Sequence, residues 1–466
     1  MDRGLRWTKN TVACAFALLT LWTAYWSVVA APSLARDPRN VRLLLEERSI
    51  TRGGIYARDG RPIAVNDPRT GRRVYVGPES LAHTIGYSDP LFGKSGLERA
   101  YNAELLGLFD GPALPRRFGA AAGRTATGWD VITTIDLDIQ SAAEEALQGR
   151  KGAVVVLDPA DGSVLAMASS PGFHPSRLGE VIAEGDDVLG PLFNRATMGQ
   201  YPPGSAFKPV ILAAALESRA VGPEHVFDDR GFIVVNGMRI DNAGEQAHGT
   251  LALDDALAVS SNAAFAELAL KAGAGAILET SLALGIGVRP EIAIPASAGR
   301  LPPVEELADS AALALIGIGQ GTLLVTPLQM AKAAAAIANG GWTVEPRLVA
   351  SLRSPDGAER PVAHPKPVRA ISAGTAHLIR ESMIRAVESG TGSQARAPGI
   401  AVAGKTGTAE NPHGRPHAWF IGFAPARSPR IAFAVVVENG GGGGSTAAPV
   451  ARAIVSRALV AGSQGD

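Results

Sequence analysis

The sequence is poor in the residues on which several classes of protein depend. It has a single cysteine, Cys14, among 466 residues, which excludes an intramolecular disulfide and a cysteine metal cluster. Its 44 basic residues balance 44 acidic ones, whereas a nucleic-acid-binding surface would need a basic excess. None of the histidines lies in a His-Glu-x-x-His motif. We therefore expect no metal, no cofactor and no nucleic-acid partner.

The N-terminus joins a short basic segment to a long segment without charge. Residues 1–10 carry three basic side chains against one acidic, and residues 11–31 carry no charged side chain. That length suits one membrane span, and its aromatic residues lie toward the distal end, where an interfacial belt is expected. We predict a cytoplasmic tail (1–10), a single-pass anchor (11–31) and an extracytoplasmic remainder. A cleaved signal peptide is the alternative.

The pattern of polar and apolar residues changes near residue 150. Residues 32–149 are polar, mixed and rich in turn signals such as Asp59-Gly60, which favours a non-catalytic pedestal or dimerisation domain. Beyond that point, two apolar runs at 152–157 and 164–168 read as strands around a turn. Helical and strand patterns continue to the C-terminus, so we predict one domain over residues 150–466.

A candidate nucleophile lies at the start of the apolar run 210–216. Pro202 and Pro203 block a helix upstream, and Pro209 is tolerated only in a first turn, so the helix should begin near Ser205. Residues three apart share a helix face, which puts the Ser205 hydroxyl beside the Lys208 amine. The positive end of the helix dipole would favour an alkoxide there.

The alternative for this pair is a capping serine followed by a solvated lysine. The choice of lysine argues against that alternative, because the chain uses arginine for most of its positive charge. Lys208 is also the one lysine with a serine three residues before it. Arginine does not release its proton in a protein, whereas a desolvated lysine can. The pattern thus favours an amine that becomes neutral and acts as a base.

Two further motifs gain meaning only when they are combined with the first. Ser260 and Asn262 are two residues apart and would not share a helix face, so they must lie on a turn or a helix start to act together. Alternatively, Ser260 or Ser261 merely caps the helix from Ala263 onward. In the strand from Lys405 to Thr408, alternate side chains would share a face. The alternative is that this segment is an ordinary edge strand with a surface lysine.

Ser-x-x-Lys, Ser-x-Asn and Lys-Thr-Gly follow one another in the order that marks penicillin-binding proteins and serine β-lactamases. With these motifs the chain resembles a class B penicillin-binding protein, a monofunctional D,D-transpeptidase, and is most similar to the penicillin-binding protein A branch. The resemblance covers nearly the whole chain. Only the middle residue, Ser261, departs from Ser-Asp-Asn, at a variable position. Further matching segments are Arg52-Gly53-Gly54-Ile55, Gly96-Leu97-Glu98, Tyr201-Pro202-Pro203-Gly204, Gly319-Gln320-Gly321 and Thr326-Pro327-Leu328-Gln329-Met330.

The resemblance implies a fold and a mechanism. The fold is an α/β (α+β) transpeptidase domain of the penicillin-binding and serine β-lactamase type, with an antiparallel sheet, flanking helices and a helical subdomain. Ser205 would attack the carbonyl between two terminal D-alanines of a stem peptide, and neutral Lys208 would take its proton. Backbone amides of Ser205 and Thr408 would form the oxyanion hole.

The resemblance also implies roles for the other motif residues. Ser260 would relay the proton to the departing D-alanine, Asn262 would bind the stem-peptide amide, and Lys405 would hold the positive field and orient Ser260. The hydroxyls of Thr406 and Thr408 would bind the terminal carboxylate. Gly407 would let a ligand backbone approach the strand.

The implied partners are peptidoglycan stem peptides, as a D-Ala-D-Ala donor and an amine acceptor, together with β-lactams, the membrane and a SEDS-type glycan polymerase or other cell-wall assembly proteins. A membrane-anchored serine β-lactamase or β-lactam sensor of the same fold is the first alternative. A Ser-His-Asp esterase is disfavoured, because no serine lies in Gly-x-Ser-x-Gly. A catalytically dead scaffold is disfavoured, because every motif residue is present.

Overall fold

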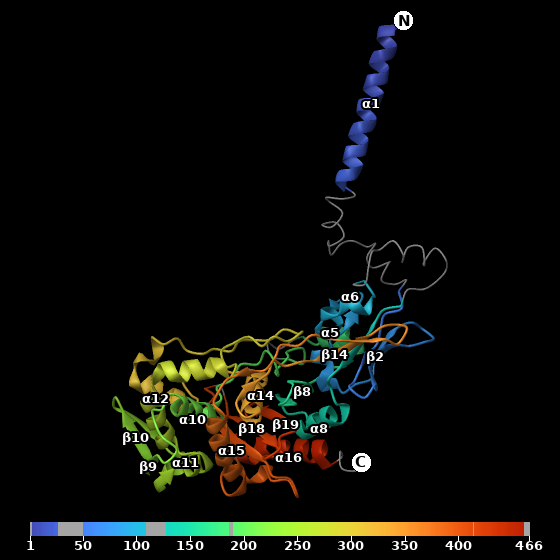
Figure 1. The fold of residues 1–466 in the computed structure, drawn as a ribbon. Helices are drawn as coiled ribbons and strands as arrows, with labels where there is room; N and C mark the ends of the chain where they lie inside the picture. Colours follow the sequence, from blue (N-terminus) through green and yellow to red (C-terminus); the bar gives the residue numbers. More distant parts are fainter. Residues whose placement is uncertain (1, 27–49, 109–126, 186–189, 413, 461–466) are drawn as a thin grey trace.

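The computed structural model describes residues 2–26, 50–108, 127–185, 190–412 and 414–460. Its first element is helix α1, Asp2–Ala24 (Figure 1). Within the described ranges, no helix has both the length and the apolarity that a membrane crossing requires. The predicted span 11–31 ends in residues 27–31, which lie outside those ranges.

A five-stranded antiparallel sheet forms the centre of the C-terminal part, as predicted. Its order is β17-β18-β19-β7-β8, with β17 at one edge. The two apolar runs predicted near residue 150 are β7 and β8. The strands are β7 Gly152–Leu157, β8 Val164–Ser170, β17 Ala403–Ala409, β18 His417–Ala424 and β19 Ile431–Val437.

Alternating side chains along these strands fill two separate cores. In β19, Phe433 and Val435 face the core under α8 and α16, while Ala432 and Ala434 face the opposite core. Every residue of β19 is buried, as expected for a strand in a sheet that is covered on both faces. The covering helices are α8 Leu137–Leu147 and α16 Gly443–Val460 on one face and α14 Pro327–Ala338 on the other.

A helical subdomain completes the C-terminal part beside β17. Helices α11 and α12 meet at Ser260 and Ser261. Two small two-stranded sheets, β9–β12 and the hairpin β10–β11, pack on these helices. The elements are α10 Lys208–Glu217, β9 Val226–Asp229, β10 Phe232–Val235, β11 Met238–Asp241, β12 Gly249–Ala252, α11 Leu253–Val259, α12 Asn262–Ala283, α13 Ser310–Gly317 and α15 Ala373–Glu388.

A six-stranded sheet in the N-terminal part includes two strands from far along the chain. Its order is β15-β14-β6-β1-β2-β3, and Figure 1 shows β14, in orange, in the same region as the blue strand β2. The Asp59-Gly60 turn predicted from the sequence lies between β1 and β2. The strands are β1 Ile55–Tyr56, β2 Pro62–Asn66, β3 Arg73–Tyr75, β6 Asp130–Thr133, β14 Val349–Arg353 and β15 Glu359–Pro361.

The contacts therefore cross the domain boundary that we predict at 149/150. Helix α8 precedes that boundary yet packs on β8, while β14 and β15 follow it yet join the N-terminal sheet. The smaller elements of the described chain are α4 Ala82–Ile85, β4 Ser88–Asp89, β5 Gly93–Lys94, α5 Gly96–Ala100, α6 Asn102–Leu105, α9 Leu178–Ala183, β13 Trp342–Thr343 and β16 Val368–Arg369.

A buried ion cluster holds the N-terminal part together. The Glu98 side chain, which is fully buried, accepts from Arg52 Nε at 2.8 Å and from Arg73 Nε at 2.6 Å. Arg73 Nη1 also donates to the carbonyl of Gly53. Because removal of one partner leaves the other charges buried and unpaired, such a cluster is sensitive to single substitutions.

We predict that Glu98→Gln lowers the melting temperature by several degrees, since breaking a buried pair costs about 3–5 kcal/mol. Differential scanning calorimetry would measure the shift. Glu79→Gln is the matched control, because Glu79 pairs with Arg177 at the surface, where such pairs contribute little. Equal melting temperatures for the two variants would contradict the structural role of Glu98.

Candidate active site

Ser205 lies in a 3₁₀ turn, Gly204–Phe207, that leads directly into α10. This placement confirms the predicted helix start, and Pro209 occupies the first turn of α10. The alternative of a capping serine and a solvated lysine is wrong for both residues, because Pro203 holds the N-cap position and Lys208 is fully buried.

Long-range contacts fix the loop that presents Ser205. Gly204 N donates to the carbonyl of Gly319 at 2.9 Å, and Trp419 Nε1 donates to the carbonyl of Pro202 at 3.0 Å. Gly204 has φ +53°, and a side chain there would collide with the Thr408 carbonyl. Glycine is therefore required where the serine loop meets strand β17.

Ser260 sits at the junction of α11 and α12, in the left-handed backbone region with φ 63°. A non-glycine residue in this region carries strain of about 1–3 kcal/mol. Ser261 caps α12 by accepting from Ala264 N at 3.0 Å, and Asn262 is the first residue of that helix. The structure thus confirms that Ser260 and Asn262 lie on a turn and a helix start, and it assigns the capping role to Ser261.

Two lysines converge on the hydroxyl of Ser260. Lys208 Nζ donates to Ser260 Oγ at 3.2 Å, to the Ser260 carbonyl at 2.7 Å and to Asn262 Oδ1 at 2.8 Å. Lys405 Nζ, from the edge strand β17, donates to the same Ser260 Oγ at 2.9 Å. The alternative of an exposed edge-strand lysine is wrong, since Lys405 is fully buried.

Burial changes the proton affinity of both amines. Burial lowers the pKa of Lys405 to about 7. Burial and, next, the positive charge of Lys405 hold the pKa of Lys208 well below its usual value, while the negative charge of Asp229 acts in the opposite direction. A low-dielectric site disfavours two neighbouring ammonium groups, so the arrangement favours one neutral amine.

The backbone of strand β17 packs directly against the turn that carries Ser205. A Cβ on Gly407 would lie 2.9 Å from Ala206 N, so a larger residue would push the strand away from Ser205. The two threonines of the motif differ. Thr408 is exposed, whereas the hydroxyl of Thr406 is buried and lies 2.7 Å from that of Thr391.

The structure thus brings Ser205, Lys208, Ser260, Asn262, Lys405 and the strand from Thr406 to Thr408 to one place. Among the described hydrogen bonds, none joins the Ser205 hydroxyl to Lys208, whose amine is turned toward Ser260 and Asn262. Comparison with known families covers both halves of the chain. Residues 152–456 match the penicillin binding protein transpeptidase domain. The chain belongs to the class B penicillin-binding proteins, the D,D-transpeptidases.

Further comparisons identify relatives that match this transpeptidase over nearly its whole length. Residues 52–131 match the penicillin binding protein A dimerisation domain. The chain is 37% identical to peptidoglycan D,D-transpeptidase PbpA of Mycobacterium tuberculosis, over 98% of this chain and 99% of that one. It is 36% identical to PbpA of Mycolicibacterium smegmatis, over 99% and 100%.

Solved structures agree with these relatives. The ceftriaxone acyl-enzyme complex of M. tuberculosis penicillin-binding protein A matches with a TM-score of 0.82 and 36% identity, covering 89% of this chain and 100% of that one. The penicillin G acyl-enzyme complex of the same protein matches with a TM-score of 0.79 and 37% identity, covering 88% and 100%. The family resemblance seen in the motifs is confirmed, and the β-lactamase or sensor alternative gains no better support.

Sequence reasoning missed the residues that hold the motifs of the transpeptidase in place. Asn242 accepts from Asn262 N, the Asn242 amide donates to Asp229, and the hydroxyl of Thr391 lies 2.7 Å from that of Thr406. Asn242 comes directly after strand β11 and carries no motif of its own. No local pattern distinguishes these side chains from solvated polar residues, because their partners are distant in the sequence.

The lowered pKa values of Lys208 and Lys405 predict a bell-shaped pH dependence of acylation. If Lys208 must be neutral, the rate rises as pH passes its lowered pKa; if Lys405 must be charged, the rate falls as pH rises through about 7. Stopped-flow measurement of acylation by a fluorescent penicillin would give the profile. Lys405→Arg, which stays charged, should remove the alkaline limb, and an unchanged alkaline limb in that variant would contradict the assignment.

Proposed function

We propose that the protein, as a peptidoglycan D,D-transpeptidase, cross-links stem peptides through an acyl-enzyme on Ser205. The observation that carries this proposal is the convergence of two buried lysines on Ser260 Oγ, next to the turn that presents Ser205. Ser205 attacks the carbonyl between two D-alanines, and Lys208 accepts the serine proton in its neutral form. Backbone amides of Ser205 and Thr408 stabilise the oxyanion, each donor worth roughly 10²–10³ in rate.

The remaining roles follow from the polar contacts around Ser260. The serine hydroxyl connects the two amines and carries the proton toward the leaving D-alanine. Asn262, held by Lys208 and by the Asp241 carbonyl, presents its amide to the stem peptide. Lys405 supplies positive charge for the terminal carboxylate.

Strand β17 supplies the other contacts with the donor peptide. We assign carboxylate binding to the hydroxyls of Thr406 and Thr408, of which Thr408 is the exposed one. Gly407 leaves room for the ligand backbone beside Ser205. A stem-peptide amine then resolves the acyl-enzyme, and a β-lactam stops the reaction at that stage.

We also propose that residues 11–31 anchor the enzyme in the cell membrane, with the catalytic domain outside and a SEDS-type polymerase or another cell-wall assembly protein as partner. Large apolar side chains of α1 support the anchor, because Phe16, Leu18 and Trp22 are each more than 60% exposed and need an apolar environment. The domain limits 32–149 and 150–466 belong to the same proposal.

Ser205→Ala should abolish covalent labelling by penicillin while the protein stays folded. Intact-mass spectrometry and peptide mapping would locate the adduct, and circular dichroism would check the fold. Ser261→Ala is a useful control, because Ser261 caps α12 without facing either lysine through its hydroxyl. A penicilloyl adduct on another serine of the Ser205→Ala protein would overturn the assignment of the nucleophile.

Lys208→Arg separates a base from a simple positive charge. Guanidinium keeps the charge but does not accept the serine proton, so acylation should fall by about 10²-fold or more. The melting temperature should be measured in parallel, because the longer head can overpack this fully buried position. A folded variant that acylates within a few-fold of the parent would mean that the base lies elsewhere.

A further inference from the structure

A buried acidic residue lies behind the Ser260–Asn262 turn. Asp229, at the end of β9, is 2% exposed, and Asn242, directly after β11, is 4% exposed. The Asn242 amide donates to both carboxylate oxygens of Asp229, at 2.8 Å and 2.9 Å. Gly231 N donates to the same carboxylate at 2.8 Å. A buried carboxylate needs such donors, because desolvation penalises its charge.

Asn242 in turn holds the turn that carries two of the motif residues. Its Oδ1 accepts from Asn262 N at 2.7 Å, from Ala263 N at 3.0 Å and from Ser261 Oγ at 3.4 Å. These donors include the first amides of α12, which have no partner within the helix. One side chain from a distant hairpin therefore fixes the helix start from which Asn262 faces Lys208.

A neutral amide at position 229 would keep one accepting oxygen for Gly231 N and the Asn242 amide, but its NH2 group could not replace the second oxygen that accepts from Asn242. The charged groups that act on Lys208 are Lys405 from β17 and Asp229 from β9, while Ser260 and Asn262 offer uncharged oxygens and Phe265 an aromatic ring. Asp229 is thus the negative charge that opposes the effect of Lys405 on Lys208.

We propose that Asp229 and Asn242 form a positioning pair: Asn242 fixes the Ser260–Asn262 turn, and Asp229 holds the Asn242 amide and supplies a buried negative charge that acts on Lys208. This inference rests on the proposed roles of Ser205 and Lys208. Removal of the negative charge should make Lys208 release its proton more readily, because burial and the positive charge of Lys405 would then act on it without opposition.

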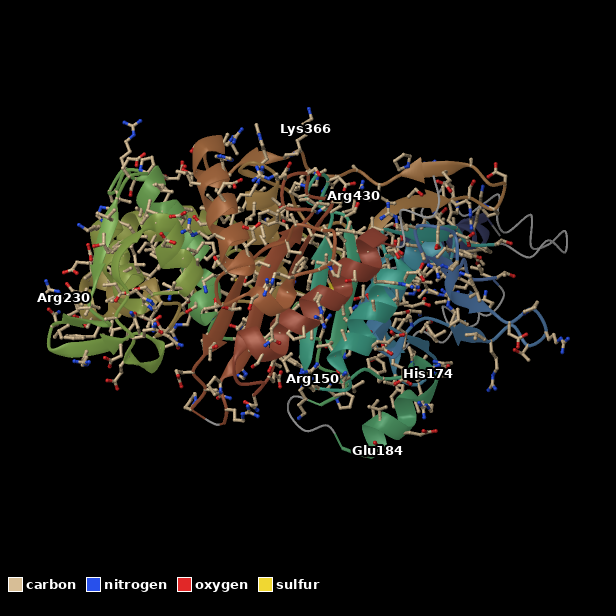
Figure 2. The ribbon with its side chains drawn as sticks, turned by 90° about the horizontal axis from the view of Figure 1, so that it is seen from below. Arg150, His174, Glu184, Arg230, Lys366 and Arg430 are labelled. Atoms are coloured by element: carbon tan, nitrogen blue, oxygen red, sulfur yellow. The ribbon has the colours of Figure 1, made fainter. Side chains whose placement is uncertain are left out.

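Asp229→Asn, which is nearly isosteric, tests the charge. We expect the acid limb of the acylation profile with fluorescent penicillin to move to lower pH by roughly half a unit or more. Asp228→Asn is the matched control from the same strand, because Asp228 is exposed and pairs with Arg230 at 2.8 Å. Figure 2 shows Arg230 at the outer margin of the molecule. The control should keep the acid limb of the parent.

Asn242→Ala tests the positioning role separately. This variant removes the acceptor of Asn262 N and Ala263 N, so the maximal acylation rate should fall by about ten- to a hundred-fold. Circular dichroism would establish that both variants are folded, and Asp229→Asn serves alone if Asn242→Ala does not fold.

Different results would contradict the role of the Asp229 charge and the role of the Asn242 contact. A profile of Asp229→Asn that superimposes on that of the parent would overturn the role of the charge, even if the melting temperature falls. An unchanged maximal rate in folded Asn242→Ala would overturn the role of the turn contact. A parent protein whose penicillin adduct does not map to Ser205 would instead overturn the proposed catalytic assignment on which this inference rests.

Discussion

Two lysine amines share one serine hydroxyl in the interior of this protein, and the active site depends on that interaction. Isolated ammonium groups are costly to bury, so the fold supplies oxygen acceptors to both amines and lowers their proton affinity. Lys208 has Ser260 and Asn262 as acceptors, and Lys405 has Ser260 and the Thr406 carbonyl at 3.0 Å. The same burial that costs stability lowers the pKa of both amines and so favours a neutral amine.

The backbone accepts strain to maintain this convergence. Ser260 adopts a left-handed conformation, which ends α11 and redirects the chain so that Asn262 begins α12 beside Lys208. The cost, about 1–3 kcal/mol, is offset by the helix caps from Ser261 and Asn242 on the far side of the turn. A strained residue held between α11 and the capped start of α12 is a rigid platform for the proposed proton relay.

Local signals predicted much of this architecture. The prolines around Ser205 located the start of its helix, and two apolar runs around a turn located β7 and β8 of the central sheet. The spacing of Ser260 and Asn262 required a turn. The Asp229–Asn242 pair and the contact between Thr391 and Thr406 could not be predicted in this way, because each joins residues from separate elements. The participation of β14 in the N-terminal sheet had no local signal either.

That shared sheet contributes to how the turn that carries Ser205 is placed relative to the N-terminal part. Strand β14 pairs with β6, Thr134 N donates to the Leu348 carbonyl, and Asp136 N donates to the Leu165 carbonyl of β8. Figure 1 shows α10 and α12 on the side away from β2 and α5. Val164 N of β8 also donates to the Arg347 carbonyl just before β14, so motion of the N-terminal sheet relative to β8 would break backbone hydrogen bonds.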